Sequence, residues 1–223
     1  MLEILYEDSH LIVCIKPVGI LSQPDGMDGE DMLTLISDYL KGKNEKPYVG
    51  LVHRLDRNVG GVMVFSKNPN VTGKLSAAIA ERNFTKEYIT VVHNCPEEPQ
   101  GIYKDLLFKD SSKNKSFVVA RPRKGVKEAS LEYVLLDAKT TDKGDISLVR
   151  IKLHTGRTHQ IRVQFSSRKM PLLGDGKYGS TDKDCEIALW SYRLAFIHPL
   201  KKKEIDFSKE PPRTYPWDRF ASI

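Results

Sequence analysis

The sequence predicts a mixed α+β fold, and three observations lead to this prediction. Short segments rich in β-branched and aromatic residues recur along the chain, as strands require. Segments with apolar residues at helical spacing are interspersed among them. The chain has 223 residues, of which 40% are hydrophobic and 29% charged, so it can bury a substantial core. Because it contains no internal repeat and no evident linker, we expect a single domain over residues 1–223.

The expected helices and strands follow one another along the whole chain. Asp31 is placed to cap a helix from residue 32 to about residue 40, and residues 69–82 form an amphipathic pattern typical of a second helix. A third, short helix is expected over residues 159–168. Strands are expected over residues 4–8, 11–15, 62–65, 84–92, 116–120, 130–137, 146–153 and 189–197.

Charge and cysteine content narrow the class of protein. The formal net charge is +6 and the pI about 9.1, which is compatible with a polyanionic partner but does not require one. The three cysteines are far apart and form neither a disulfide framework nor a CxxC metal site, which favours a reducing compartment. No apolar run approaches the roughly 18 residues that cross a membrane, and the N-terminus lacks the features of a signal peptide. We therefore expect a cytoplasmic protein without membrane contact.

The most informative stretch runs from Val52 to Gly61 and precedes a short apolar run. Within it, Asp56 lies between Arg54 and Arg57. Opposite charge favours the ionised carboxylate, and an ionised carboxylate suits a nucleophile or base better than a proton donor. For an isolated aspartate between arginines, an ordinary salt-bridged loop residue is the more frequent explanation.

Three other stretches allow two interpretations each when taken alone. Arg157 and Arg162 lie in a polar segment that fits either a phosphate-binding site or a solvated helix face. Tyr88 fits a core aromatic residue of a strand. The glycines from Gly174 to Gly179 match neither a P-loop nor a dinucleotide-binding pattern, so a tight turn is the better interpretation.

Histidine spacing argues against a metal site. The six histidines are scattered, and His154 and His159 are five residues apart, whereas a helical zinc pair is four apart. No cysteine or carboxylate cluster lies near them, so we expect no metal.

Together these stretches closely resemble, in order, the motifs of the RluA-type pseudouridine synthases. The resemblance covers nearly the whole chain. The matching stretches are Lys16-Pro17-x-Gly19-x-Leu21, His53-Arg54-Leu55-Asp56, Lys86-x-Tyr88, Thr155 to Val163, Gly174-Asp175-x-x-Tyr178-Gly179 and Leu194-x-Phe196-x-His198-Pro199.

The resemblance implies a fold, an activity and a set of site residues. The family's fold is a largely antiparallel mixed sheet with flanking helices and a central active-site cleft. Its members isomerise uridine in RNA to pseudouridine without a cofactor or metal. The catalytic residues it implies are Asp56, Tyr88 and Arg162. The residues implied for RNA binding and base flipping are Arg54, His53, Arg157, His159 and Gln160, and those implied for structural loops are Gly61, Gly156 and Gly174.

The chain departs from the family pattern at three places. Val59-Gly60 replaces the usual Thr-Ser, Gln164 replaces a histidine, and Leu189-Trp190-Ser191 replaces Leu-His-Ala. These changes affect hydrogen bonds around the site and substrate choice, and they leave the catalytic positions intact. Many relatives also carry a small N-terminal RNA-binding domain, whereas here we expect the catalytic domain alone.

The expected partner is a stem-loop of ribosomal or transfer RNA, bound by a monomer. Local basic residues must then grip the RNA, and the candidates are Arg121, Arg123, Lys124, Lys127 and the run Lys201-Lys202-Lys203, although a lysine run is more often solvated surface. Two alternatives are a catalytically silent RNA-binding protein on the same scaffold and a hydrolase with Asp56 as its nucleophile. The hydrolase lacks a second acidic residue beside Asp56.

Overall fold

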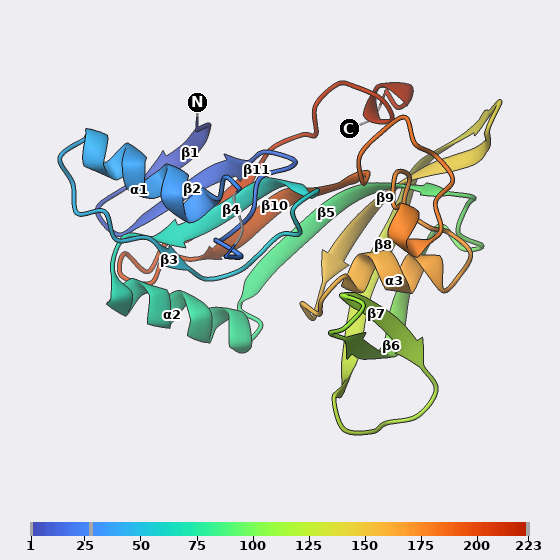
Figure 1. Ribbon diagram of the computed structural model, residues 1–223, viewed down its shortest axis with the longest axis horizontal. Helices are drawn as coiled ribbons and strands as arrows, with labels where there is room; N and C mark the ends of the chain where they lie inside the picture. The colour runs from blue at the N-terminus through green and yellow to red at the C-terminus, as the bar shows by residue number, and fades with distance from the viewer. Residues whose placement is uncertain (1, 27–28, 222–223) are drawn as a thin grey trace. The chain divides into compact units, whose positions relative to one another are not determined.

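A computed structural model describes residues 2–26 and 29–221, and the chain divides into two compact units. Unit 1 comprises Met1–Lys86 and Ser191–Lys209, and unit 2 comprises Glu87–Trp190 and Glu210–Ile223. Strands β5 (Phe84–His93) and β10 (Leu189–Ile197) contain residues of both units. Each unit is built on antiparallel strands (Figure 1).

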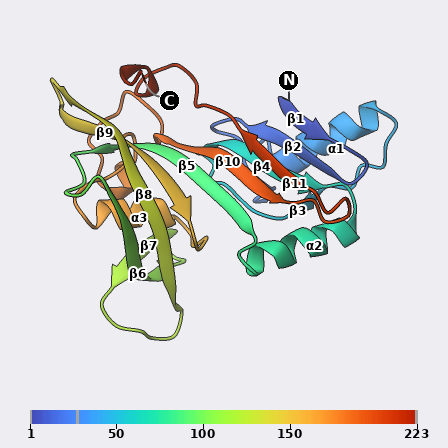
Figure 2. The ribbon, with the colours of Figure 1, turned by 180° about the vertical axis from the view of Figure 1, so that it is seen from behind.

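The strands of unit 1 follow the order β1-β2-β4-β10, with β11 on β10 and β3 on β4 (Figure 2). Strand β2 pairs with β4 from Leu11 opposite Ser66 to Lys16 opposite Gly61. The bounds are β1 (Ile4–Glu7), β2 (Leu11–Lys16), β3 (Gly50–Leu51), β4 (Gly60–Ser66) and β11 (Glu204–Ser208).

The core of unit 1 surrounds β2 and β4, every residue of which is buried. Burial on both faces explains why these strands are continuous apolar runs rather than alternating patterns. Helices α1 (Met32–Gly42) and α2 (Pro69–Ala80) each bury one apolar face. Asp31 caps α1 by accepting hydrogen bonds from the backbone N–H groups of Leu33 and Thr34, as its sequence position predicts.

Unit 2 is built on the strand order β5-β9-β8-β6-β7. Helix α3 (Gln160–Ser166) buries nearly all of its residues, and Phe165 is completely inaccessible to solvent. The remaining bounds are β6 (Gln100–Asp110), β7 (Lys115–Val119), β8 (Val126–Thr141), β9 (Gly144–Leu153) and the short 3-10 helices η1 (Gly176–Tyr178) and η2 (Trp217–Arg219).

The predicted α+β class and the largely antiparallel sheet are confirmed, and three helix boundaries are wrong. Helix α2 ends at Ala80 rather than at residue 82, because Arg82 adopts a left-handed conformation with φ 62°. Helix α3 spans Gln160–Ser166 rather than residues 159–168, because His159 has φ 52° and Lys169, just past the predicted end, has φ 61°. At none of these three boundaries does a proline or glycine mark the end residue of the helix.

Three strands were not predicted from the sequence: β3, β6 and β11, of which β3 has only two residues. Strand β6 is mostly half-exposed or exposed, with Leu107 its one buried residue, so it has no continuous apolar run. Strand β11 alternates exposed and intermediate residues over only five positions and gains its order by pairing with β10. In the described residues, no helix is long and apolar enough to cross a membrane.

Gly61 has a conformation and a neighbour that both exclude a side chain. Its φ is +119°, and a Cβ atom there would lie 2.3 Å from the carbonyl oxygen of Ser191. The two strands β4 and β10 therefore approach as closely as they do because this position carries no side chain.

We expect Gly61→Ala to lower the free energy of unfolding by about 3 kcal/mol, since backbone strain and a clash with another strand combine. Gly73→Ala is the matched control: this helical glycine has nothing within 4 Å of where a Cβ atom would lie, and alanine there should raise stability by up to about 1 kcal/mol. Urea unfolding of both variants tests this, and equal stability of the two would contradict it.

Candidate active site

The Asp56 loop is fixed to unit 1 on both sides of the aspartate. On one side, the hydroxyl of buried Ser22 donates to the carbonyl of Leu55 at 2.8 Å and accepts from its N–H at 3.0 Å. On the other side, the N–H of Gly19 donates to the carbonyl of Arg57 at 2.9 Å. The carbonyl of Asp56 itself accepts from the N–H of Val59 at 3.0 Å, which closes a turn. The half-buried carboxylate therefore projects from a backbone that is anchored at each neighbouring residue.

Lys16 supplies a positive charge beneath this loop. Its side chain is completely buried, and its ammonium group donates to three carbonyls, those of Pro17, Ile20 and Arg57. Burial lowers the pKa of Lys16 to about 8, and the Asp56 carboxylate acts in the opposite direction by stabilising the ammonium. The lysine of the Lys16-Pro17 motif is thus electrostatically coupled to the predicted catalytic aspartate.

His53 and Arg54, the two residues expected to handle RNA in this loop, have opposite environments. Arg54 is exposed, as contact with a phosphate or base requires. His53 is 8% exposed, and its Nε2 accepts from the N–H of Val64 at 3.2 Å. Burial, followed by the charge of Lys86, lowers the pKa of His53 well below its ordinary value. A neutral histidine bonded to strand β4 supports the loop, and this environment fits a structural role better than direct contact with RNA.

Strand β5 carries the Lys86-x-Tyr88 motif. Tyr88 lies in unit 2 and is 6% exposed. Lys86 lies in unit 1, with its ammonium 5.6 Å from the centre of the Phe84 ring, and burial lowers the pKa of Lys86 to about 8. Lys86 is a candidate that the sequence analysis did not place in the site, although its motif was noted.

The turn before α3 is held by the side chain of Gln160. Its Oε1 accepts from the hydroxyl of Thr155 at 2.8 Å and from the N–H of Arg157 at 3.0 Å, and its Nε2 donates to the carbonyl of Ser130 at 3.1 Å. Gln160 is 3% exposed, so its amide shapes the turn from within the protein. Arg157 is half-buried, and its Nε donates to the carbonyl of Glu128 at 2.9 Å.

Arg162 forms a buried ion pair with Asp175. The guanidinium Nε donates to Oδ2 of Asp175 at 2.7 Å and Nη2 donates to Oδ1 at 2.8 Å. The side chains are 6% and 0% exposed, respectively. The guanidinium also lies 5.0 Å from the centre of the Tyr178 ring. Asp175 is a site residue that sequence reasoning missed, and the motif Gly174-Asp175-x-x-Tyr178-Gly179 was the signal that could have found it.

Tyr178 joins His159 to strand β7. Its hydroxyl accepts from the N–H of Ser116 at 2.8 Å and lies 3.0 Å from Nδ1 of His159. Because that hydroxyl proton can then be donated to Nδ1, the arrangement favours the histidine tautomer with its proton on Nε2. Ser116 also donates its hydroxyl to the carbonyl of Thr158 at 2.6 Å.

The glycines expected in structural loops differ in their geometry. Gly174 has φ +74°, and a Cβ atom there would lie 2.3 Å from the carbonyl oxygen of Glu186. Gly61 lies at the start of β4 and has the constraints described above. Gly156 has no atom within 4 Å of a Cβ position and no positive φ, so nothing in its surroundings requires glycine.

The predicted site residues are divided between the two units. Unit 1 contains Asp56, His53, Arg54 and Gly61. Unit 2 contains Tyr88, Gly156, Arg157, His159, Gln160, Arg162 and Gly174. Within unit 2, the structure brings Arg162 and His159 together around Tyr178. In the described part of the chain, no group of His, Cys, Asp or Glu side chains is suited to hold a metal ion.

The fold and the ordered motifs define a class of RNA-modifying isomerases, and comparison with known proteins agrees. A sequence profile described as RNA pseudouridylate synthase matches residues 10–167. An uncharacterised RNA pseudouridine synthase of Aquifex aeolicus is 34% identical over 96% of this chain and 71% of that protein. The ribosomal large subunit pseudouridine synthase D of Zymomonas mobilis is 31% identical over 95% of this chain and 70% of that protein.

The solved structure of human RNA pseudouridylate synthase domain containing 4 shares the fold. It superposes with a TM-score of 0.77 at 22% identity, covering 95% of this chain and 89% of the human chain. The chain therefore belongs to the RNA pseudouridylate synthase family, whose members are enzymes that isomerise uridine in RNA.

The buried neutral state of His53 predicts a pH dependence of stability. In the unfolded chain this histidine binds a proton below about pH 6.5, whereas in the folded protein its lowered pKa keeps it neutral. Protonation of the unfolded state therefore removes stability as the pH falls below 6.5. Between pH 7.5 and 5.5, the wild type should lose about 1 kcal/mol more than His53→Gln, measured by urea unfolding at both pH values. An identical loss in the two proteins would show that His53 does not titrate in this way.

Proposed function

We propose that this enzyme converts uridine in the RNA of the large ribosomal subunit to pseudouridine, with Asp56 as its essential carboxylate. The observation that carries the assignment of Asp56 is its position on a loop anchored at Leu55 and Arg57, above the buried charge of Lys16. The ribosomal target is supported by the relative in Zymomonas mobilis, which is named as a ribosomal large subunit synthase.

The chemistry requires a bond at the sugar to be broken and remade. The target uridine first leaves its stack, at a cost of a few kcal/mol. The bond between the sugar and the base nitrogen then breaks, the uracil rotates, and a carbon of the base joins the sugar. That carbon loses a proton and the freed nitrogen gains one, so the product is an isomer of the substrate. Asp56 acts on the sugar as nucleophile or base, a role that a carboxylate can fill.

Tyr88, Arg162 and Arg54 take the remaining roles that the motifs imply. Tyr88 stacks on the freed uracil or moves a proton. Arg162 supplies a guanidinium that stays protonated and can donate directed hydrogen bonds in the reaction. Arg54, exposed and two residues before Asp56, helps to hold the flipped nucleotide.

A second feature supports RNA binding by unit 2. Residues 109–127, which span the end of β6, β7 and the start of β8, contain seven lysines and arginines and one acidic residue. Their net charge of +6 equals that of the whole chain, so the rest of the chain, with 28 basic and 28 acidic residues, is neutral. We call residues 109–127 the basic hairpin.

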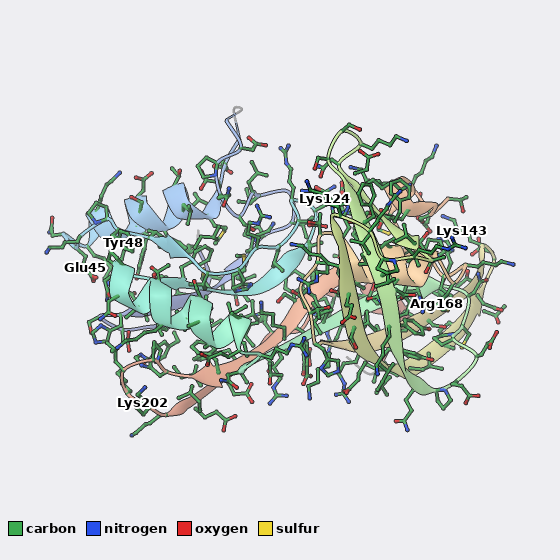
Figure 3. The ribbon with its side chains drawn as sticks, turned by 90° about the horizontal axis from the view of Figure 1, so that it is seen from below. Glu45, Tyr48, Lys124, Lys143, Arg168 and Lys202 are labelled. Carbon is green, nitrogen blue, oxygen red and sulfur yellow. The ribbon has the colours of Figure 1, made fainter. Side chains whose placement is uncertain are left out.

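The basic hairpin combines charge with apolar surface. Six of its seven basic residues are exposed, and the seventh, Lys115, is half-buried beside the rings of Phe117 and Tyr178. Phe117 and Val118 are each 36% exposed, and an aromatic ring beside cations is a platform on which a base can stack. The segment between β7 and β8 is a loop at the free end of these strands, and Lys124 lies on it (Figures 1 and 3). This surface fits the sugar-phosphate backbone of an RNA.

The first test is a transcriptome-wide pseudouridine map of cells that lack the gene, complemented with the wild type, Asp56→Ala or Asp38→Ala. Asp38 is a control because its carboxylate is 62% exposed on α1. A uridine of the large-subunit RNA should lose its modification and regain it with the wild type and Asp38→Ala only. If no site changes, the proposed substrate is wrong. If Asp56→Ala also restores the modification, the catalytic assignment is wrong, whatever the substrate.

The basic hairpin predicts the salt dependence of RNA binding. Lys124→Gln/Lys127→Gln should reduce the slope of log affinity against log salt by about 1.4, since each phosphate contact to single-stranded RNA contributes about 0.7. Lys41→Gln/Lys46→Gln is the matched control, with the same two changes at exposed residues of unit 1 that are not among those expected to bind RNA. Its slope should match that of the wild type. Fluorescence anisotropy with a labelled transcript of the mapped segment gives both slopes, and equal slopes for the two double variants would refute the assignment.

A further inference from the structure

The motif Gly174-Asp175-x-x-Tyr178-Gly179 is explained by its contacts with Arg162. Arg162 is 5% exposed and its guanidinium stays protonated in proteins, so a full positive charge is buried in unit 2. A buried charge is costly unless it is paired and hydrogen-bonded. Asp175, with a side chain that is 0% exposed, supplies the negative charge through both carboxylate oxygens.

The loop that carries Asp175 is itself held rigidly. The N–H of Asp175 donates to the carbonyl of Leu172 at 3.1 Å, and its carbonyl accepts from the N–H groups of Tyr178 at 3.0 Å and Ser180 at 3.1 Å. Gly174 can occupy its position only without a side chain, because backbone carbonyls lie within 2.6 Å of a Cβ position. The carboxylate is therefore presented to Arg162 from a backbone with little freedom.

The ring of Tyr178 also restrains the Arg162 guanidinium. Tyr178 packs against it at 5.0 Å and belongs to a buried cluster with Val163 of α3 and with Leu107 and Ala129 of the sheet. A guanidinium is planar and rigid, so two hydrogen bonds along its Nε–Nη2 edge determine the direction of its Nη1 group.

We propose that Asp175 is a positioning residue, whose carboxylate orients the Arg162 guanidinium for the reaction. The inference rests on the proposed function, because it assigns Asp175 a role only through Arg162. Because the ion pair is neutral as a whole, Arg162 acts through the direction of its N–H groups rather than through a long-range positive field.

The size of the effect follows from the geometry of positioning. A displacement of about 1 Å in a catalytic group can cost on the order of 100-fold in rate. Asp175→Asn keeps the shape of the side chain, but its amide can accept along only one of the two N–H directions. We therefore expect kcat to fall by roughly 30- to 100-fold, with KM for the RNA within about 2-fold of the wild type, because Asp175 is completely buried and presents no surface to the RNA.

Asp105→Asn is the matched control. Asp105 pairs with Arg168, which follows α3, at 3.0 and 3.2 Å, so this variant removes a second carboxylate–guanidinium pair next to the same helix. It should leave kcat within about 2-fold of the wild type. A loss in both variants would indicate that α3 merely needs its ion pairs for stability, and would overturn the positioning role.

A double-mutant cycle separates positioning from an independent role. If Asp175 acts only through Arg162, then Asp175→Asn added to Arg162→Lys should lower kcat no further than Arg162→Lys alone. Additive losses would overturn the inference. Thermal unfolding midpoints and RNA affinity are measured for each variant, so that kcat is compared among folded, RNA-binding proteins.

Asp175→Glu keeps the inference testable if Asp175→Asn fails to fold. The longer side chain retains the charge and shifts the guanidinium, so a folded variant with reduced kcat and unchanged KM is expected, and wild-type kcat would refute the geometric argument.

The substrate in all of these assays is a transcript of the segment identified by the pseudouridine map. An inactive wild type would contradict the proposed function, whereas an active wild type, an inactive Asp56→Ala and a fully active Asp175→Asn would contradict this inference alone.

Discussion

The ammonium group of Lys16 is the constraint on which the Asp56 loop depends. It is completely buried and donates to the carbonyls of Pro17, Ile20 and Arg57. A buried ammonium is costly unless it is hydrogen-bonded, and the chain segments on both sides of the loop supply its acceptors. These hydrogen bonds fix the backbone next to Asp56, and they leave the charge of the lysine uncancelled by the carbonyls. The aspartate is therefore both oriented and electrostatically supported by one side chain.

Unit 2 also contains a buried positive charge, that of Arg162, but its partner is a carboxylate rather than backbone carbonyls. Arg162 is buried against the carboxylate of Asp175 and the ring of Tyr178, so its charge is neutralised locally. Carbonyl groups are neutral, so Lys16 keeps its net positive charge. The carboxylate of Asp175 cancels the charge of Arg162 and fixes the direction of its N–H groups. The two basic residues thus act differently: Lys16 acts through its positive charge, and Arg162 acts through hydrogen-bond donors of fixed orientation.

The excess positive charge lies in the basic hairpin, whereas the residues proposed for catalysis lie elsewhere in the chain. The basic hairpin contains the whole excess of positive charge, and the remainder of the chain is neutral. Exposed charges on a hairpin attract a polyanion over a Debye length, whereas the buried groups near Asp56 and Arg162 act over hydrogen-bond distances. A modest overall charge of +6 is therefore consistent with a strongly basic binding surface.

The sequence by itself determined the elements whose signals are local. Strands β2 and β4 are continuous apolar runs, α1 has its cap at Asp31, and the family's motifs identified Asp56, Tyr88 and Arg162 as the candidates. Tertiary structure decided the rest: the pairing that orders β6 and β11, the burial of His53 and Gln160, the early end of α3, and the partnership of Arg162 with Asp175. Each of these depends on contacts between residues distant in sequence, where neither hydrophobic period nor propensity carries information, whereas caps and apolar runs depend on neighbours along the chain.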